Sequence, residues 1–199
     1  HTRPLTEISF VRDTADRTLL VSSAHDKLPQ IRNGESGDWL GSFEGHKGAV
    51  WSCKVDPKTC SLAATASGDF SAKLWCATTG KELQEWKHKH VVKTVDFSHD
   101  SMLVATGCQN GQIAIYQTSS PATPPLELKV SADSSGAPTK LFWENDENPT
   151  MVVVGKKDGS MEKWDTKGGE SGAQAPAVKR SLSSAGATIQ DMEYHPAHK

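Results

Sequence analysis

One segment of the chain combines the side-chain types of a hydrolytic site. His46, Thr65 and Asp69 supply an imidazole, a hydroxyl and a carboxylate, the three groups of a Ser-His-Asp type triad. No G-x-S-x-G motif, which would present the nucleophile on a strained turn, accompanies them. The phosphate-binding motifs G-x-x-x-x-G-K-[ST] and G-x-G-x-x-G are also missing from the sequence. We therefore predict no catalytic residue, no cofactor and no enzymatic activity.

Cysteine and histidine side chains could bind a metal, but their spacing does not fit a zinc site. The cysteines, none of them in a C-x-x-C pair, are Cys53, Cys60, Cys76 and Cys108. His88 and His90 lie close together but have no thiol near them in the sequence. The first residues show no secretory signal, so we expect reduced thiols rather than a disulfide framework. The sequence predicts no metal site and an intracellular location.

The composition is that of a folded protein without a strong charge. The chain has 199 residues, 36% of them hydrophobic, and a formal net charge of −2. Binding to a phosphate backbone depends on a clear excess of Lys and Arg, so we expect no direct nucleic-acid binding. The longest apolar runs, such as residues 151–154, are far shorter than the roughly 20 residues of a membrane span. We expect one domain or two small ones and no membrane insertion.

Internal repeats organise the sequence. Residues 45–57 align with residues 87–99, and His1 opens an earlier copy. A second landmark, a turn residue followed by an aromatic side chain, recurs at residues 67–76, 110–117 and 158–165. Together the landmarks predict repeats at approximately 1–44, 45–86, 87–129 and 130–178, with a partial copy at 179–199.

Each repeat shows the pattern of short antiparallel strands. Apolar and polar residues alternate with period two, and Gly, Asn, Asp and Ser separate the runs. In the second repeat this pattern predicts strands at residues 50–55, 62–66, 71–75 and 82–86. Four strands in a repeat of about 40 to 45 residues are typical of a propeller blade. We predict an all-β fold.

The repeats resemble those of WD-repeat β-propellers over nearly the whole chain. Within that group the chain resembles the family of the serine/threonine kinase receptor-associated protein, also called the UNR-interacting protein. The stretches that carry this likeness are residues 37–43, 46–51, 69–75 and 88–97. The resemblance implies a seven-bladed ring, of which the chain would form about four and a half blades as the N-terminal part of a longer protein.

The same resemblance implies a function. It implies a non-enzymatic scaffold for protein–protein interactions in the survival-of-motor-neuron (SMN) complex, in snRNP assembly, mRNA processing and splicing, and in TGF-β receptor signalling. The implied partners are Gemin subunits of that complex, the cold-shock RNA-binding protein UNR, and TGF-β receptor and Smad proteins. The implied location is the cytoplasm and the nucleus. All of this is analogy, since a fold does not fix a function.

Two alternatives stay open. The WD-repeat subunit i of eukaryotic translation initiation factor three shares a His-x-Gly-Ala-Val-Trp sequence with residues 46–51. Another WD-repeat adaptor would also carry blades of this kind. Residues 88–97 favour the receptor-associated family over the initiation factor.

By resemblance, the candidate triad has a structural role. Its side chains, with Trp75, resemble the Asp-His-Ser/Thr-Trp tetrad of WD repeats, a hydrogen-bond chain that stabilises a blade. A hydroxyl on a strand packed between blades would be closed to substrate, which disfavours hydrolysis. The complete tetrad is His46, Thr65, Asp69 and Trp75. The partial tetrads are His1, Ser22 and Asp26 in the first repeat, His88, Thr106, Asn110 and Tyr116 in the third, and Asp158 and Trp164 in the fourth.

The resemblance also indicates where partners would bind. In propellers, residues three and five positions after the tetrad His face the narrower, upper opening, where partners often dock. These positions are Pro4, Thr6, Ala49, Trp51, Val91 and Lys93. Trp51 would be either an exposed interface anchor or a side chain packed against a neighbouring blade. Phe70 is a further candidate with the same two interpretations, and we interpret residues 87–90 as a solvated turn rather than a site for an acidic partner.

Overall fold

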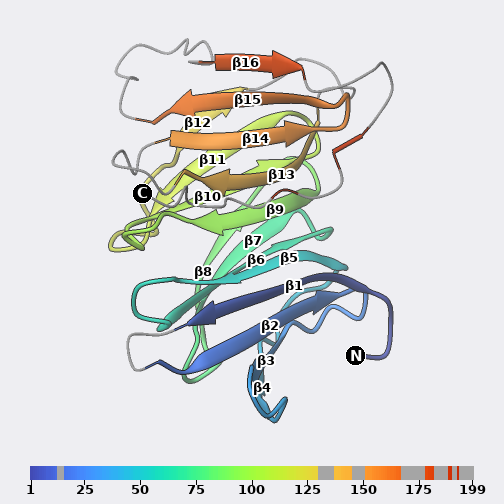
Figure 1. The fold of residues 1–199 in the computed structure, drawn as a ribbon, viewed down its shortest axis with the longest axis vertical. Coiled ribbons are helices and arrows are strands. Elements are labelled where there is room, and N and C mark those ends of the chain that lie inside the picture. Colours follow the sequence, from blue (N-terminus) through green and yellow to red (C-terminus); the bar gives the residue numbers. More distant parts are fainter. Residues whose placement is uncertain are drawn as a thin grey trace.

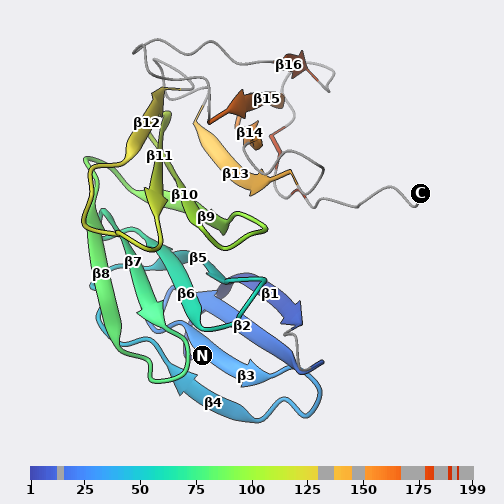
Figure 2. The ribbon, with the colours of Figure 1, turned by 90° about the vertical axis from the view of Figure 1, so that its left-hand side faces the viewer.

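The computed structural model contains four antiparallel β-sheets that follow one another along an arc (Figure 1, Figure 2). Each sheet has four strands, and the strands lie in chain order. The structure describes residues 1–12, 16–129, 137–144, 151–166, 178–181, 188, 189 and 192. The predicted all-β class is confirmed. Most of the predicted partial copy at 179–199 lies outside the described residues, and the seven-bladed ring stays a prediction.

The strands have the following bounds. The first sheet contains β1 (Leu5–Arg12), β2 (Thr18–Ala24), β3 (Gln30–Asn33) and β4 (Trp39–Ser42). The second contains β5 (Val50–Val55), β6 (Leu62–Ser67), β7 (Ser71–Cys76) and β8 (Glu82–Lys87). The third contains β9 (Val92–Phe97), β10 (Leu103–Cys108), β11 (Gln112–Gln117) and β12 (Leu126–Lys129). The fourth contains β13 (Pro138–Trp143), β14 (Met151–Lys156), β15 (Ser160–Asp165) and β16 (Val178–Ser181).

The strands of the second sheet begin at the predicted residues and end within one residue of the predicted ends. The alternating pattern locates these strands because one set of side chains along each strand packs against the next sheet. β16 pairs with β15 and so belongs to the fourth sheet, although it crosses the expected repeat boundary at residue 178. The boundaries between repeats stay predictions.

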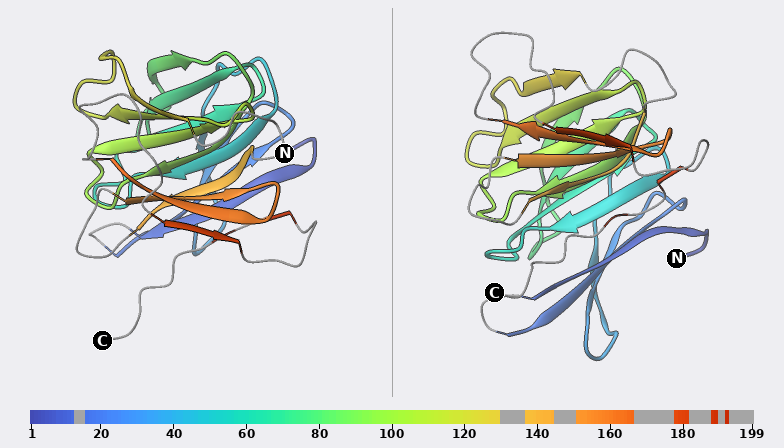
Figure 3. Two further views of the ribbon diagram at one scale, coloured as in Figure 1. Left: turned by 90° about the horizontal axis from the view of Figure 1, so that it is seen from above. Right: turned by 45° about the horizontal axis from the view of Figure 1, so that its top comes forward.

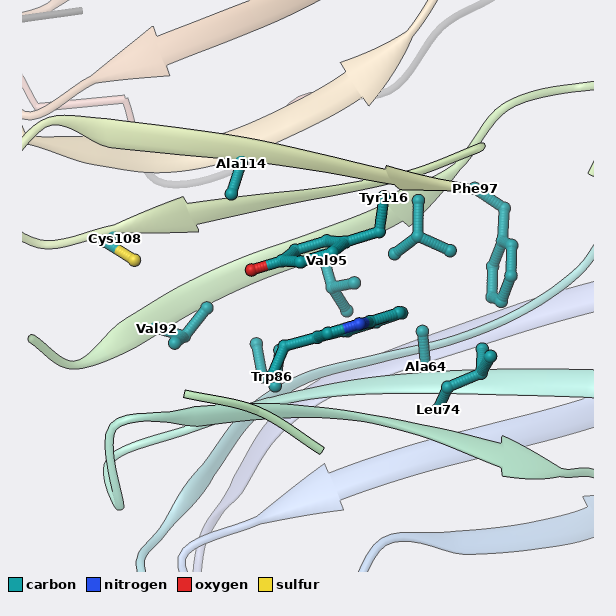
Figure 4. Close-up of a cluster of buried hydrophobic side chains, with 12 residues drawn as sticks. Ala64, Leu74, Trp86, Val92, Val95, Phe97, Cys108, Ala114 and Tyr116 are labelled. Carbon is teal, nitrogen blue, oxygen red and sulfur yellow. The ribbon is translucent and has the colours of Figure 1, made fainter. Parts of the chain in front are cut away.

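Apolar side chains fill the space between consecutive sheets, which pack face to face (Figure 3). Between the second and third sheets, the rings of Trp86 and Tyr116 stack with centroids 4.1 Å apart (Figure 4). Such aromatic pairs add to the stability gained from area burial alone. On the first sheet, β1 instead exposes Leu5, Ile8 and Phe10.

The first strands of the sheets are joined to one another by polar side chains. Glu7 on β1 accepts a hydrogen bond from the Cys53 N–H on β5, at 3.1 Å. The Ser52 hydroxyl accepts one from Val95 N–H on β9, at 3.3 Å. The β9 side chains of Thr94 and Asp96 in turn accept hydrogen bonds, each 3.2 Å long, from the main-chain N–H groups of Leu141 and Trp143 on β13. Side-chain oxygens of each of the first three sheets thus accept hydrogen bonds from main-chain N–H groups of the following sheet.

Glu7 is the most heavily connected of these side chains. Its Oε1 lies 2.6 Å from Lys140 Nζ and 3.4 Å from Lys54 Nζ, and its Oε2 also accepts a hydrogen bond from the Ser52 hydroxyl. Burial alone would raise the pKa of Glu7, but the two ammonium groups and the hydrogen bonds lower the pKa overall. One carboxylate therefore connects the first sheet with the second and the fourth.

A β-bulge occurs in the first strand of every sheet. In each case one residue of the first strand has no partner in the pairing with the second strand. Bulges of this kind bend the strand and redirect a side chain. The bulged residues are Thr6, Trp51, Lys93 and Thr139.

We predict that Glu7→Ala lowers the free energy of unfolding by about 3 kcal/mol, because it removes the counter-charge of two partly buried ammonium groups and the acceptor of the Cys53 N–H. Urea denaturation followed by circular dichroism measures this loss. Glu35→Ala, which removes an exposed carboxylate, is the matched control. Equal stability of the two variants would show that the Glu7 network does not hold the sheets together.

Candidate functional site

Most of the candidate residues lie at the end of the sheets where each first strand begins. We call this end the upper end, whatever its place in the figures. Because neighbouring strands are antiparallel, the turn between the second and third strands lies at this same end. The described segments at the upper end are 1–4, 25–29, 43–49, 68–70, 88–91, 109–111, 137 and 157–159.

In the second sheet, the side chains of the expected tetrad form a continuous hydrogen-bond chain. Asp69 Oδ2 lies 2.8 Å from His46 Nδ1, and His46 Nε2 lies 2.6 Å from Thr65 Oγ1. The Trp75 indole donates to Thr65 Oγ1 at 2.9 Å. Because the ionised Asp69 carboxylate can only accept, His46 donates to it through Nδ1, and in the neutral imidazole Nε2 then accepts from the Thr65 hydroxyl. This series of hydrogen bonds runs from the turn between β6 and β7 to the buried indole of Trp75.

Asp69 also organises the turn between β6 and β7. Its carboxylate accepts hydrogen bonds from the Lys47 N–H and from the N–H and hydroxyl of Ser71. Burial alone would raise the pKa of Asp69, but the hydrogen bonds, led by that of His46, hold it well below its usual value. The ionised carboxylate is therefore the form that stabilises the turn.

This geometry does not suit hydrolysis. Thr65 is 0% exposed, and its hydroxyl oxygen is already occupied by the Trp75 indole. A nucleophile needs an approach path for the substrate carbonyl. The hydrogen-bond chain encloses the hydroxyl instead, so its arrangement fits a structural role.

The first sheet contains a similar network without the indole. His1 lies 2.8 Å from Asp26 and 2.7 Å from Ser22. Asp26 also accepts hydrogen bonds from the N–H groups of Thr2 and Leu28. Arg32, at the position of the tryptophan, donates instead to the carbonyl of Gly37.

The third sheet differs from the predicted partial tetrad. His88 Nδ1 lies 3.2 Å from the Cys108 sulfur, and Nε2 lies 3.3 Å from the Tyr116 hydroxyl. Thr106 donates to its neighbouring strand and Asn110 accepts from Gln112, so neither joins His88 in the described structure. The stack of Tyr116 on Trp86 fixes where the phenol oxygen meets the imidazole. Burial lowers the pKa of His88 to about 4.

In the fourth sheet the two expected residues are separate. The Asp158 carboxylate accepts hydrogen bonds from the N–H and hydroxyl of Ser160 and so stabilises its turn. The Trp164 indole N–H is buried without a hydrogen-bond partner among the described residues. Val154, buried at the position of the tetrad hydroxyl, offers no acceptor. Packing therefore holds Trp164.

The predicted positions Pro4, Ala49 and Val91 join the loops of the upper end. Their carbonyl oxygens accept hydrogen bonds from the N–H groups at the adjacent turns of the first, second and third sheets. The distances are 3.0 Å for Pro4 to His25, 2.8 Å for Ala49 to Gly68 and 2.9 Å for Val91 to Gln109. Pro4 is exposed, whereas Ala49 and Val91 are half-buried. These three residues shape the surface mainly through their backbones.

Trp51 lies where three sheets meet. The Lys93 ammonium nitrogen sits 3.1 Å from the Trp51 ring centroid, and the His25 ring contacts the indole edge-on at 4.9 Å. The indole is half-buried, so it is both packed between neighbours and reachable from outside. Burial lowers the pKa of Lys93. Thr6, the matching residue of the first sheet, binds inward through its hydroxyl to the Val50 carbonyl at 2.6 Å.

Phe70 is exposed, with 49% of its surface accessible. It occupies the turn between β6 and β7 with a φ of 66°, in the left-handed region that aromatic residues rarely adopt. This backbone conformation keeps the ring on the surface of the upper end.

Sequence reasoning missed three residues. Ala137 and Thr139 are the fourth-sheet counterparts of Ala49 and Trp51: the Ala137 carbonyl accepts from Lys157 N–H at 3.0 Å, and Thr139 is the bulged residue. Counting back from Asp158 with the spacings of the second and third repeats would have placed both only to within about two residues. Glu7 offered no signal, since a single acidic residue in a strand usually faces solvent.

Comparison with known proteins agrees with this geometry. The WD domain, G-beta repeat family matches residues 37–76 and 80–117. Serine-threonine kinase receptor-associated protein from Mus musculus is 40% identical over 83% of this chain and 45% of its own length. The Gallus gallus protein of the same name is 38% identical over 98% of this chain and 52% of its own length.

The chain is a WD40-repeat protein related to serine-threonine kinase receptor-associated protein. It spans about half the length of the curated relatives it matches. Eukaryotic translation initiation factor 3 subunit I from Schizosaccharomyces pombe is 29% identical over 98% of this chain and 59% of its own length. The crystal structure of the computationally designed Ika8 protein shares the fold, with a TM-score of 0.73, 21% identity, and coverage of 94% of this chain and 52% of that one.

WD40 repeats form scaffolds for protein–protein interaction that are generally non-enzymatic, and these WD40 sheets fit that role. Within the described residues, no group of His, Cys, Asp and Glu side chains could hold a metal ion. The four cysteines are free thiols. The described part of the chain also contains no helix with the length and hydropathy needed to cross a membrane.

We predict that Asp69→Asn lowers the free energy of unfolding by about 2 kcal/mol at neutral pH, because the ionised carboxylate is the better acceptor in the tetrad. The pKa of Asp69 is lowered in the folded state, so its contribution is present above the ordinary value of 3.8 and is lost as the pH falls below that value. Urea denaturation from neutral pH to below 3.8 measures the difference from the unmodified chain.

Asp38→Asn, in which an exposed carboxylate is replaced, controls for the loss of one charge. The difference between Asp69→Asn and the unmodified chain should narrow as the pH falls. A constant difference across the range would mean that the carboxylate charge is not what stabilises the turn.

Proposed function

We propose that the chain is a non-enzymatic scaffold whose upper end binds partner proteins, with Trp51 as the main anchor. The supporting observation is the position of the indole at the junction of three sheets, half-buried and held by Lys93 and His25. Interface anchors are often tryptophans fixed by their neighbours before binding, since a preorganised side chain loses little entropy.

A hydroxyl and a thiol that contact a histidine, those of Thr65 and Cys108, do not suit a nucleophile, which supports a non-enzymatic role. Thr65 is enclosed, as described above. The contact between Cys108 and His88 has the composition of a Cys-His pair, but burial raises the pKa of Cys108 to about 12. A reactive cysteine needs the opposite shift, toward the thiolate.

The relatives at about 40% identity guide the proposed cellular role. By resemblance to them we assign the chain to SMN-complex and snRNP assembly, mRNA processing and TGF-β receptor signalling. The proposed partners are Gemin subunits, UNR, and TGF-β receptor and Smad proteins, in the cytoplasm and nucleus. The alternative, a role like that of initiation factor 3 subunit I, rests on the lower identity of 29%.

We predict that purified Gemin subunits capture the chain in a pull-down and that Trp51→Ala weakens capture about tenfold, as expected for an interface anchor. The substitution removes a half-buried ring together with its cation–π contact, so the fold should lose about 2 kcal/mol and remain folded. Quantitative pull-down together with a thermal unfolding curve measures both effects.

Trp39→Ala is the matched control, because this tryptophan is 59% exposed and begins β4 at the opposite end of the sheets. Capture only by initiation factor 3 subunits would favour the alternative role. Unfolding of Trp51→Ala would show that Trp51 is a core residue, and unchanged capture would show that the upper end does not bind through it.

A further inference from the structure

The loop between β11 and β12, residues 118–125, contains two hydroxyl residues that directly precede a proline. Of the ten prolines in the sequence, only Pro121 and Pro124 follow a serine or a threonine, namely Ser120 and Thr123. The loop passes the end of β8 in the second sheet, where Trp86 contacts it (Figure 2). Both Ser-Pro and Thr-Pro pairs of the sequence therefore lie in one loop at the junction of two sheets.

A hydroxyl residue before proline suits one class of enzyme, the proline-directed protein kinases. A kinase binds the segment around the acceptor hydroxyl in an extended conformation. Proline favours extended backbone at the residue before it, and it has no N–H that would need a partner in the kinase. Surface loops are also the segments that another protein reaches most easily. The loop therefore has both the sequence and the location of a phosphorylation site.

The local structure distinguishes the two pairs. The Thr123 N–H donates to the Ser120 carbonyl at 3.0 Å, which closes a β-turn with Pro121 as its second residue, a position that proline favours. Pro121 is half-buried, and its carbonyl accepts a hydrogen bond from the Trp86 indole at 2.7 Å. Pro124 follows the turn and is exposed. The turn thus explains the first proline but not the second, and Thr123-Pro124 is the pair that a kinase can reach.

The Thr123 hydroxyl is accessible but has a role in the turn. Ala122, Thr123 and Pro124 are all exposed. The Thr123 hydroxyl donates to the Ser120 carbonyl at 2.7 Å, so the same carbonyl accepts from both the main chain and the side chain of Thr123. A surface turn opens at a much lower free energy than a sheet. The loop can therefore present this hydroxyl while the sheets stay folded.

We propose that Thr123 is phosphorylated by a proline-directed protein kinase and that the phosphate opens the turn that holds the loop against Trp86. The new bond joins Thr123 Oγ1 to the γ-phosphorus of ATP. The bond from that phosphorus to the β,γ-bridging oxygen breaks and releases ADP, and the hydroxyl proton passes to the catalytic aspartate of the kinase. This inference goes beyond the proposed scaffold function and does not depend on it.

Phosphorylation reverses the part that Thr123 Oγ1 plays in the turn. The ester oxygen has no proton to donate, and the phosphate places up to about two negative charges beside the Ser120 carbonyl. The turn loses a hydrogen bond and gains a repulsion. The Trp86 indole, which is 5% exposed, finds its acceptor on Pro121 inside this turn. Opening of the turn therefore weakens the contact between the loop and the second sheet.

The surroundings of the loop do not neutralise the phosphate. A hollow of about 320 Å³ beside the loop is lined by two lysines, Lys87 and Lys89, and by two glutamates, Glu85 and Glu127. His88 in the same hollow adds no charge at neutral pH, because burial lowers its pKa to about 4. These charges balance, so the hollow has no positive excess that would bind the phosphate. The modified side chain stays accessible to a partner.

The first test treats the whole chain with a purified proline-directed kinase and Mg-ATP, and mass spectrometry counts and locates the phosphates. We expect a single phosphate, on Thr123, and no phosphate on Thr123→Ala. Pro124→Ala should lower the initial rate about tenfold, because it restores an N–H and removes the bias toward extended backbone. Circular dichroism checks that each variant is folded.

Ser120→Ala is the matched control, since it removes the other hydroxyl before a proline and keeps the carbonyl that closes the turn. This variant should be phosphorylated at the rate of the unmodified chain. A synthetic peptide of residues 117–127 shows that the kinase is active. Modification of the peptide but not of the chain would overturn the proposal, and so would failure of both. Phosphate on Ser120, or an unchanged rate for Pro124→Ala, would overturn it as well.

The second test follows the indole N–H resonances by NMR spectroscopy before and after phosphorylation. The Trp86 resonance should move upfield as its hydrogen bond to Pro121 weakens. The indole of Trp75, which donates to Thr65 inside the second sheet, should not move and is the internal control. Thr123→Ala, which removes the hydroxyl without adding charge, should give a smaller shift of Trp86. An unchanged Trp86 resonance on the phosphorylated chain would show that the turn stays closed and would overturn the proposed opening.

Discussion

The structure depends on hydrogen bonds that pass from the side chains of one first strand to the main chain of the next. Glu7 binds the Cys53 N–H, Ser52 binds the Val95 N–H, and Thr94 binds the Leu141 N–H. A single sheet of four strands cannot bury its two faces, so it needs both apolar packing and a fixed register against its neighbours. Apolar clusters supply the first. The directional polar contacts supply the second, since a main-chain N–H donates a strong hydrogen bond only along a narrow range of directions.

This fixed register gives the upper end its shape. With the first strands aligned, the bulges bring Trp51 and Lys93 from neighbouring sheets into contact. The tetrad of the second sheet then holds the turn that carries Phe70, through the carboxylate of Asp69. The proposed binding surface is thus assembled from loops that are distant in sequence but attached to one set of strands. Loops on a rigid scaffold can generally vary without changing the elements that carry them.

Much of this could be predicted from the sequence, for identifiable physical reasons. The strands of the second repeat were located correctly because side chains alternate between neighbouring sheets, and Gly and Asp mark the turns. Of the contacts of His88, the one with Tyr116 belongs to the expected partial tetrad, whereas the one with Cys108 was not expected. The stack of Tyr116 on Trp86 joins two different sheets, and no local sequence pattern records it. Glu7 was missed for a similar reason, since its partner Lys140 is far away in the chain. The exposure of Phe70 depended on a backbone angle that the sequence left open.

The most direct test of this account is hydrogen exchange of the main-chain amides at the junctions between sheets, followed by NMR spectroscopy of the whole chain. If the first strands hold the sheets together, the amides of Cys53, Val95 and Leu141 should be among the slowest to exchange and should share one opening free energy, that of global unfolding. Exchange of these amides at separate rates, each matching its own sheet, would contradict the account. The sheets would then open independently, and the polar contacts between first strands would not unite them.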